Sequence, residues 1–544
     1  MTSDGPVRTR IISGIQFTHF WAFAIGVVLV TAGVIMHLPD FLSMESMGYR
    51  MVGMPMSSEM LWGMAAIIVG LGLSTYGLLP SWASLKAAPM EPTAARYGRA
   101  MDDAKLTGAH WWLLFVLGIA LVIDVMKPAT IGFILPGMRS EYGMSTARTA
   151  LLPLFALTGT TVGSLLWGVL SDRIGRRASI LLAAVFFVGT SICGFMPSFA
   201  WNLFMCFVMG LAAGGMLPIV YALMAETVPA KKRGWLVILH GGLGTAVGYL
   251  VASGIAAVFE PIYTWRILWF FGLPTGLLIV VLNRWIPESP RFLLARGQVT
   301  AAHTVMGQFG ISALAQSDEA LGPRAQHARG LMALFRHGLG RHSTVVMVYG
   351  LGWGLVNWGF VTFLPTILRD GGLQTSAPAL LFYAALVSVP GTVLVAYLYG
   401  RWSSRKSMSG FAWLTMATLL AFAFLGGNLG RVSPSILIGL TAVLMFSSTA
   451  VISMLSPYAA EVYPTDLRGT GSGLAAASSK LGGMIGPPLV GALLTSAGGT
   501  FLPALVTSIP IGLAGVFLLL FGEETHERGL ERISAPAVST EVVG

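Results

Sequence analysis

Charged residues are scarce in this sequence. Of its 544 residues, 55% are hydrophobic and only 10% are Asp, Glu, Lys or Arg, whereas a typical soluble domain has about 25% charged residues. A chain so poor in charge cannot cover a water-facing surface of its own size. The composition therefore excludes a soluble enzyme and indicates a protein that is largely covered by lipid.

Cysteines, nucleotide motifs and a cleavable leader are also lacking. The two cysteines, Cys193 and Cys206, lie in apolar runs, which excludes a disulfide framework and a cysteine-based metal site. No Gly-x-x-x-x-Gly-Lys-Ser/Thr motif occurs, so we expect no ATP drive and no cofactor. The first apolar run follows Arg8 and Arg10 without a clear small-residue cleavage site, and we expect it to remain as an anchor.

Long apolar runs fill most of the chain. A membrane-spanning helix needs about 20 mostly apolar residues. Fourteen runs of this kind occur, near residues 16–36, 60–80, 111–135, 147–170, 178–196, 200–224, 235–258, 265–286, 343–368, 379–399, 408–427, 433–458, 469–495 and 499–521. The predicted fold is an all-α membrane protein with fourteen spans.

The distribution of Lys and Arg predicts the orientation. The formal net charge of +10 could suggest nucleic acid, but the basic residues form short clusters at alternate turns between apolar runs. This is the positive-inside pattern of a multispanning protein. We therefore expect both termini in the cytoplasm, a cell (inner) membrane location, lipid rather than nucleic acid as the surroundings, and a monomer.

The chain divides at its longest polar stretch. This stretch separates six spans from six, and two further spans precede them. The predicted parts are an N-terminal two-helix extension with its linker, an N-terminal six-helix bundle, a cytoplasmic central loop, a C-terminal six-helix bundle and a cytoplasmic tail, at 1–110, 111–286, 287–342, 343–521 and 522–544.

The two halves repeat each other. Glu226-Thr-Val-Pro-Ala-Lys-Lys-Arg233-Gly recurs as Glu461-Val-Tyr-Pro-Thr-Asp-Leu-Arg468-Gly, with Glu, Pro, Arg and Gly at the same spacing. Internal repeats are typical of transporters whose site lies between two bundles near the membrane midplane.

A basic turn between the second and third core spans carries the resemblance to a known family. Its sequence, Gly168-Val-Leu-Ser-Asp172-Arg173-Ile-Gly175-Arg176-Arg177, resembles the signature loop of the major facilitator superfamily. Gly168 would permit close helix approach. The resemblance implies that Glu226 and Glu461 pair with nearby arginines that gate the inward mouth.

Two further motifs narrow the resemblance. The segment Pro287-Glu288-Ser289-Pro290-Arg291 is similar to the loop after helix 6 of sugar porters, organic-ion transporters and aromatic-acid–proton symporters. The segment from Asp124 to Pro136 resembles core helix 1 of the aromatic-acid–proton symporters. That motif has a second acid where this chain has Lys127, and Cys206 stands where an arginine is often found in helix 4. The C-terminal copy of the signature loop has lost its acid.

Buried charges predict the chemistry. Asp124 lies about 18 Å along its helix at 1.5 Å per residue, near the midplane, with Lys127 on the same face. Lys480 also lies near the midplane. Charges there are costly and mark substrate or proton paths. We predict that Asp124 couples a proton and that Lys127 and Lys480 bind an anion, while a self-neutralising Asp–Lys pair is the alternative.

Other polar residues are weaker candidates. His240 could relay a proton or pack between helices. Tyr349, Asn357, Trp358 and Tyr458 lie on core helices that line the cavity in the resembled fold, and each could bind a substrate or a neighbouring helix.

An outside loop of the extension is rich in methionine. His37 and the methionines Met51, Met54 and Met56 lie in it. Thioethers with imidazole suit a soft metal such as Cu(I), but methionine is equally an apolar filler.

The sequence predicts a secondary transporter with alternating access and no enzyme activity. The expected function is proton-coupled symport of a small organic anion, an aromatic or other carboxylate. Alternatives are transport of sugars, polyols or other neutral metabolites, drug efflux, copper-related transport through the methionine-rich loop, and a sensor without transport.

Overall fold

The computed structural model describes most of the chain. The described residues are 10–12, 15–79, 101, 104–311, 331–335, 339–373, 376–426, 429–463, 467–497 and 499–525. Part of the expected linker, the middle of the central loop and the end of the tail lie outside them. Thirteen described helices are long and apolar enough to cross a membrane. The expected span at 469–495 is helical but not among the thirteen, because glycine and serine dilute its apolar residues.

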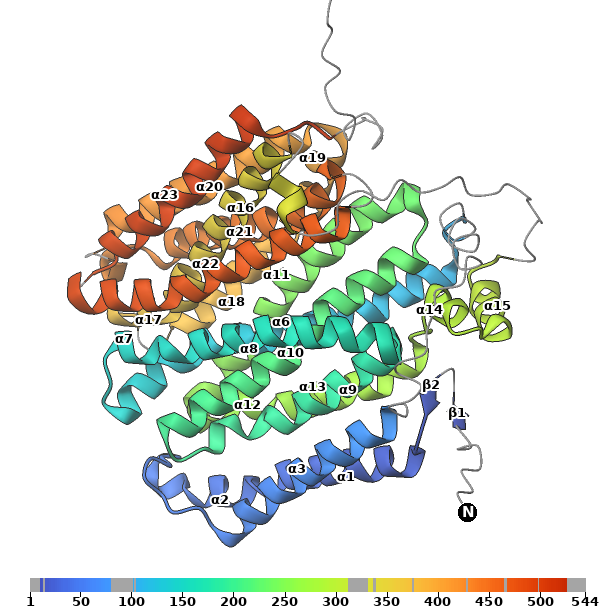
Figure 1. Ribbon diagram of the computed structural model, residues 1–544. Coiled ribbons are helices and arrows are strands. Elements are labelled where there is room, and N and C mark those ends of the chain that lie inside the picture. Colours follow the sequence, from blue (N-terminus) through green and yellow to red (C-terminus); the bar gives the residue numbers. More distant parts are fainter. Residues whose placement is uncertain are drawn as a thin grey trace, which may run out of the picture. The chain divides into compact units, whose positions relative to one another are not determined.

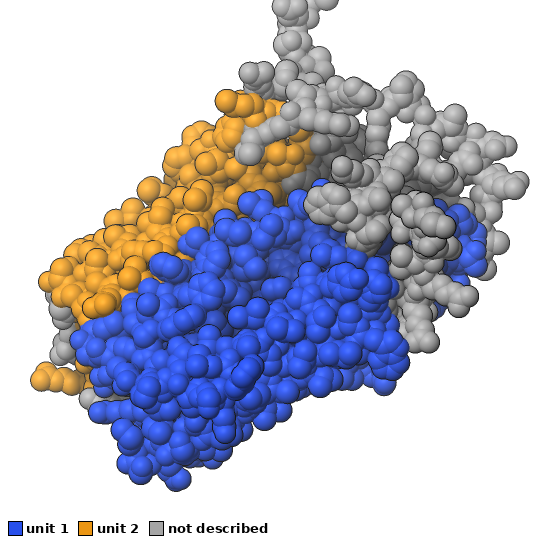
Figure 2. All heavy atoms as spheres, turned by 60° about the horizontal axis from the view of Figure 1, so that its bottom comes forward, with its two compact units in different colours: residues 1–144, 155–234, 251–315 blue, residues 145–154, 235–250, 316–544 orange. Residues whose placement is uncertain are grey.

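The chain forms two compact units (Figure 2). Unit 1 comprises residues 1–144, 155–234 and 251–315, and unit 2 comprises residues 145–154, 235–250 and 316–544. Helix α11 (Ala230–Tyr263) belongs to both, because its middle part falls in unit 2. Residues 145–154 and 235–250 thus group with unit 2, and the boundaries of the five predicted parts stay a prediction.

Unit 1 begins with a short ribbon and an N-terminal hairpin, residues 20–78. Strands β1 (Arg10–Ile12) and β2 (Ile15–Phe17) pair antiparallel, a small departure from the expected all-α chain. Helices α1 and α3 then run side by side, joined by α2 and η1 (Figure 1). Their bounds are α1 Phe20–Ile35, α2 Leu38–Ser43, η1 Glu45–Met47 and α3 Ser58–Leu78.

The remaining helices of unit 1 correspond to the first six core spans. Most of α8 lies in this unit. Their bounds are α6 Gly108–Tyr142, α8 Leu151–Ile174, α9 Arg176–Gly189, η2 Thr190–Phe195, α10 Phe199–Thr227, α12 Ile267–Phe270, α13 Gly272–Leu282 and η3 Asn283–Trp285. Two short helices, α14 (Pro290–Ala295) and α15 (Val299–Gln308), form the described start of the central loop.

Unit 2 contains the other six core spans. Its first span changes from α-helix through a π-helical turn, η5, and a 3-10 turn, η6. The bounds are α7 Thr146–Thr149, η4 Leu331–Phe335, α16 Gly340–Gly354, η5 Leu355–Phe360, η6 Val361–Phe363, α17 Leu364–Asp370, α18 Ala377–Ser388, α19 Gly391–Arg401, α20 Ser404–Leu425, η7 Leu429–Arg431, α21 Pro434–Val462, α22 Arg468–Ala497 and α23 Phe501–Phe521.

Local sequence explains where helices start. Ser57, Ser198 and Ser403 precede α3, α10 and α20, and each side chain accepts a hydrogen bond from a backbone N–H of the first turn. These bonds satisfy donors that a helix start leaves open. The apolar stretches between the caps keep their backbone hydrogen bonds within the helix, as lipid requires.

Glycines hold α1 and α3 together. A Cβ added at Gly33 would lie 2.5 Å from the carbonyl oxygen of Gly63, and one added at Gly70 would lie 2.7 Å from that of Gly26. Both separations are too short for real atoms. The two backbones therefore pack directly against each other, which is how small residues associate helices where lipid supplies no hydrophobic drive.

We predict that Gly33→Ala destabilises the hairpin, because its methyl group forces the two backbones apart. The expected cost is about 1–3 kcal/mol, typical of overpacking. Gly72→Ala is the matched control, since nothing lies within 4 Å of a Cβ there. Thermal unfolding in detergent measures both, and equal midpoints for the two variants would contradict the packing.

Candidate transport site and gate network

Helix α6 carries the buried pair expected near the midplane. Asp124 is 7% exposed and Lys127 is 2% exposed. The Lys127 Nζ donates to the Phe187 carbonyl and to the Thr190 hydroxyl, both at 2.6 Å, and lies 4.1 Å from the Phe187 ring centroid. Lys127 therefore joins α6 to α9 and η2, a role that sequence reasoning missed. Its contact with a substrate stays a prediction.

Helix α22 carries the other predicted cation, Lys480. The side chain is half-buried. A Cβ at Gly354 would lie 2.2 Å from the Ser479 carbonyl oxygen and 2.6 Å from the Gly483 nitrogen. The end of α16 therefore touches the α22 backbone beside Lys480, and the π-helical turn with Asn357 starts directly after this contact.

A hollow in unit 2 lies at this π-helical turn. Counting space open to solvent, its volume is about 340 Å³, and no charged side chain lines it. Its lining residues are Thr245, Ala246, Tyr249, Asn357, Val361, Ala385, Ser388, Met445, Ser448 and Thr449. π-Helical turns occur frequently at functional sites. Asn357 is the one predicted site residue in the lining. The other lining residues were not predicted. Thr245 and Tyr249 lie four residues apart in the otherwise apolar helix α11, and this spacing was the sign in the sequence that they face the same site.

The remaining predicted substrate contacts are scattered. The Tyr349 hydroxyl donates to the Met408 carbonyl at 3.1 Å, and the Tyr458 hydroxyl donates to the Glu523 carbonyl at 3.1 Å. Both tyrosines thus bind other parts of unit 2. Trp358 and His240 are half-buried. Substrate binding or proton transfer by these residues stays a prediction.

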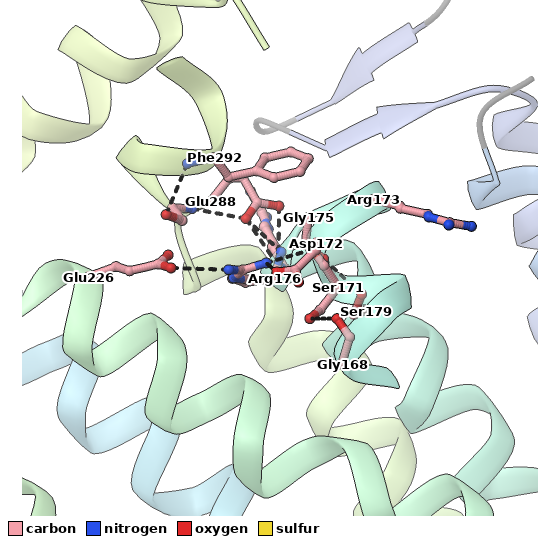
Figure 3. A network of polar contacts seen from close by, with 12 residues as sticks. Gly168, Ser171, Asp172, Arg173, Gly175, Arg176, Ser179, Glu226, Glu288 and Phe292 are labelled. Atoms are coloured by element: carbon pink, nitrogen blue, oxygen red, sulfur yellow. Dashed lines mark hydrogen bonds and ion pairs between the residues drawn. The ribbon is translucent and has the colours of Figure 1, made fainter. Parts of the chain in front are cut away.

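The signature loop forms an ion-pair network at the start of α9 (Figure 3). Arg176 donates to the Asp172 carboxylate at 2.6 Å and to the Glu226 carboxylate at 3.1 Å. The Asp172 side chain is 70% exposed, whereas those of Arg176 and Glu226 are about 15% exposed. Exposed ion pairs contribute little to stability. Of the two ion pairs of Arg176, the one with Glu226, which joins α9 to α10, is therefore the stronger.

Glu288 caps α9. Its carboxylate accepts the backbone N–H of Arg176 at 2.8 Å, of Arg177 at 3.2 Å and of Ser289 at 2.9 Å. An anion at a helix N-terminus satisfies open donors and is favoured by the helix dipole. Gly175 has φ +102°, and a Cβ there would lie 2.3 Å from a Glu288 carboxylate oxygen. The glycine of the motif is therefore required by the approach of Glu288.

Other motif residues have separate roles. The Arg177 Nε donates to the Asn283 carbonyl at 3.0 Å. The Arg173 carbonyl accepts from the Arg296 guanidinium, while the Arg173 side chain points away from the network (Figure 3). The close helix approach expected at Gly168 is not found among the described residues, because nothing lies within 4 Å of a Cβ there.

Unit 2 repeats the cap with different residues. Glu524 follows α23, and its carboxylate accepts the Ser404 N–H at 2.9 Å and both the Ser404 and Ser403 hydroxyls at the start of α20. Each unit thus caps the third helix of its six with a glutamate that follows the sixth helix. The lost acid in the C-terminal loop concealed this repeat.

The contacts seen at the two copies of the sequence repeat differ. The Glu461 carboxylate accepts from the Tyr399 hydroxyl at 2.7 Å, where Glu226 binds an arginine. Arg233 donates to the Val228 carbonyl at 2.9 Å. Arg468 begins α22, and its side chain lies outside the described part of the chain.

The methionine-rich loop folds onto unit 1. His37 donates through Nδ1 to the Gly33 carbonyl at 2.7 Å, and its ring stacks on Phe195. Met51 is buried, whereas Met54 and Met56 are half-buried. These positions serve packing, and a soft-metal site there stays a prediction.

An ion pair that sequence reasoning missed holds this loop. Arg266 and Glu141 are joined at 2.8 Å with both side chains buried, and Arg266 also donates to the Gly194 carbonyl at 2.7 Å. Met51 of the loop donates its N–H to Glu141 at 3.1 Å. In the sequence, the place of Arg266 beside Trp265 was a usable sign of its burial.

Comparison with known proteins agrees with this architecture. Residues 109–536 match the family described as sugar (and other) transporters. The chain is 26% identical over 434 residues to the niacin transporter NiaP of Acinetobacter baylyi, covering 78% of this chain and 96% of that one. It is 28% identical over 440 residues to the 4-hydroxybenzoate transporter PcaK of Pseudomonas putida, covering 78% and 95%. The solved structure of the xylose transporter XylE from E. coli has a TM-score of 0.61 at 16% identity, covering 78% and 100%.

The buried cap predicts a pH dependence of stability. Burial raises the pKa of Glu288 from 4.5 to about 7, although the three backbone N–H groups oppose the rise. The folded state therefore holds this proton more tightly than the unfolded state. The free energy of unfolding should decrease as the pH rises from 4.5 through 7, by up to about 3 kcal/mol.

Glu288→Gln isolates this contribution, because the amide keeps an acceptor for the α9 start but does not ionise. Thermal unfolding midpoints are measured from pH 5 to pH 8. Between these pH values the midpoint of the parent protein should fall more steeply than that of the variant, because only the parent loses the proton of Glu288 there. Parallel curves for the two proteins would show that Glu288 does not titrate in this range.

Proposed function

Because the chain belongs to the sugar (and other) transporter family of the major facilitator superfamily, we propose that it carries a small organic anion, an aromatic or other carboxylate, together with protons. The family confirms the prediction of a multi-pass membrane transporter and not an enzyme. The observation that carries the substrate proposal is chemical. Niacin and 4-hydroxybenzoate, for which the two relatives are named, are both aromatic carboxylic acids.

Asp124 supports the proton part of the proposal. It is a buried carboxyl group in the middle of a membrane-spanning helix, where an ionisable group is costly and usually functional. Protonation removes the charge of Asp124. The charged and neutral forms therefore favour different surroundings for this part of α6. His240 is the second proposed proton carrier.

Lys480 supports the anion part better than Lys127. The Lys127 ammonium already has two acceptors and a ring face inside unit 1. Lys480 is half-buried and lies beside the junction of α16 with the π-helical turn that lines the hollow. We therefore assign the carboxylate to Lys480 and the uncharged body of the substrate to the hollow around Asn357.

A neutral sugar is the second candidate. The uncharged threonine, tyrosine, asparagine and serine side chains of the hollow favour it, because such groups bind hydroxyls without a counter-ion. The two candidates differ in substrate charge, and a transport assay separates them.

Uptake into proteoliposomes with an imposed proton gradient tests the proposal. We expect accumulation of benzoate, nicotinate or 4-hydroxybenzoate and none of xylose. Asp124→Asn should abolish accumulation but leave exchange of labelled for unlabelled substrate, because binding remains while proton release is lost. Uptake of xylose alone would favour the sugar candidate, and normal accumulation by the variant would remove Asp124 from coupling.

Lys480 is tested in the same assay. Lys480→Gln should weaken carboxylate binding by about 2–3 kcal/mol, or roughly 30- to 150-fold, through loss of a charge-assisted hydrogen bond. Lys127→Gln is the matched control and should alter thermal stability more than affinity. If Lys127→Gln weakened substrate binding and Lys480→Gln did not, Lys127 would be the residue that binds the substrate carboxylate.

The proposal includes a cell (inner) membrane location with both termini in the cytoplasm, supported by the alternating basic clusters. Ser46 is exposed in the loop between α2 and α3, and the two native cysteines are buried. A Ser46→Cys variant should therefore react with an impermeant maleimide added to intact cells. Labelling only after the membrane is opened would invert the topology.

A further inference from the structure

Helix α9 is enclosed by protein. In its span, Arg176–Phe195, 94% of the most apolar stretch is buried, compared with 33–67% in the other candidate spans. The N-terminal hairpin supplies part of this cover. A Cβ at Gly189 would lie 3.3 Å from Ile67, 3.6 Å from Leu71 and 3.6 Å from Val30, so α1 and α3 pack directly on α9.

The covered turn is the one that binds Lys127. Gly189 stands between Phe187, whose carbonyl accepts from Lys127, and Thr190, whose hydroxyl does the same. This is where α9 changes into the 3-10 helix η2. From the side of α13, Gly272 leaves room for the ammonium, since a Cβ there would lie 2.7 Å from Nζ.

Lys127 depends on these neutral partners. No ion pair involves it within the described ranges. Its charge is balanced only by a carbonyl, a hydroxyl and a ring face, which together offset part of the cost of a cation inside a membrane. If the turn from Phe187 to Thr190 shifts, the acceptors separate and the lysine draws in water.

The hairpin is also fixed at its outer end. Met51 donates its N–H to Glu141 at 3.1 Å and Gly53 donates to the Pro197 carbonyl at 3.2 Å. The Phe41 and Phe195 ring centroids lie 5.2 Å apart. The hairpin is therefore docked both on the membrane part of α9 and on the segment that follows η2.

We propose that the N-terminal hairpin is the cover of Lys127: it excludes lipid and water from the turn Phe187–Thr190 and so keeps the acceptors of the lysine in place. The family match begins only at residue 109, after the hairpin, and Lys127 replaces an acid of the resembled motif. The extra helices and the unusual cation thus occur together in this chain.

The native cysteine Cys193 provides the test. Cys193 donates to the Thr190 carbonyl at 2.8 Å, beside the covered turn. Cys206 is buried on α10 and lies close enough to Lys127 and Cys193 to interact with both, so general unfolding is followed by the thermal unfolding midpoint instead. The full chain in lipid nanodiscs is treated with N-ethylmaleimide, and the alkylation rate at each cysteine is read by peptide mass spectrometry.

The variant Val30→Ala, Ile67→Ala, Leu71→Ala trims the face of the hairpin that touches α9. Its matched control, Val28→Ala, Ile68→Ala, Leu61→Ala, removes the same residue types from exposed positions. We expect alkylation of Cys193, measured well below the unfolding midpoints of both variants, to be about tenfold faster in the first variant than in the control, through easier local opening.

Adding Lys127→Met to the trimmed variant isolates the lysine. Methionine fills the site without a charge that needs water, so the Cys193 rate should return to within about twofold of the control. Three results overturn the proposal: equal Cys193 rates in the trimmed and control variants, acceleration that persists with Lys127→Met, or acceleration found only at temperatures where the trimmed variant unfolds.

Discussion

Every charged group inside a lipid-covered bundle must find its partners within the protein, because lipid offers none. In the described part of unit 1, α9 and its continuation supply partners for three charged side chains. The start of α9 gives its N–H groups to Glu288, its end accepts from Lys127, and the carbonyl of Gly194 accepts from Arg266. Charges on α6, on the segment before α12 and on the central loop are thus satisfied by one stretch of backbone.

In both units a glutamate satisfies the open N–H groups at the start of the third core helix, although the local sequences differ. Glu288 and Glu524 occupy equivalent places after the sixth helix of each half, although the loops that they cap differ in charge and composition. In both places a carboxylate satisfies open N–H groups at a helix start and is favoured by the helix dipole. The Arg176 guanidinium binds Glu226 in unit 1, and the Glu461 carboxylate accepts from the Tyr399 hydroxyl in unit 2.

The fold could be predicted because each membrane span is encoded by a long run of apolar residues. Twenty apolar residues make a span whatever surrounds them, and the motif around Asp172 and Arg176 has several residues in register. The partners of single charges could not be predicted in the same way. Lys127 lies on the expected helix at the expected depth, but its direction depends on the room left by Gly272 and on the turn at Phe187, neither of which a sequence pattern encodes. Glu141 and Arg266 are 125 residues apart, so nothing local connects them. Helix periodicity shows which face a residue occupies, and contacts across elements decide what that face meets.

The order in which the chain is made adds a consequence to the placement of Lys127. Its acceptor at Phe187 lies 60 residues further along, so at about 5–20 residues per second the ribosome needs roughly 3 to 12 s to deliver it. During that interval α6 carries a cation that has no acceptor yet, and the helix that will provide one is still being synthesised. The hairpin, however, is already complete. When α9 emerges, the hairpin that covers one side of it is thus already made, whereas α10 and α13, which also pack against α9, are still to come.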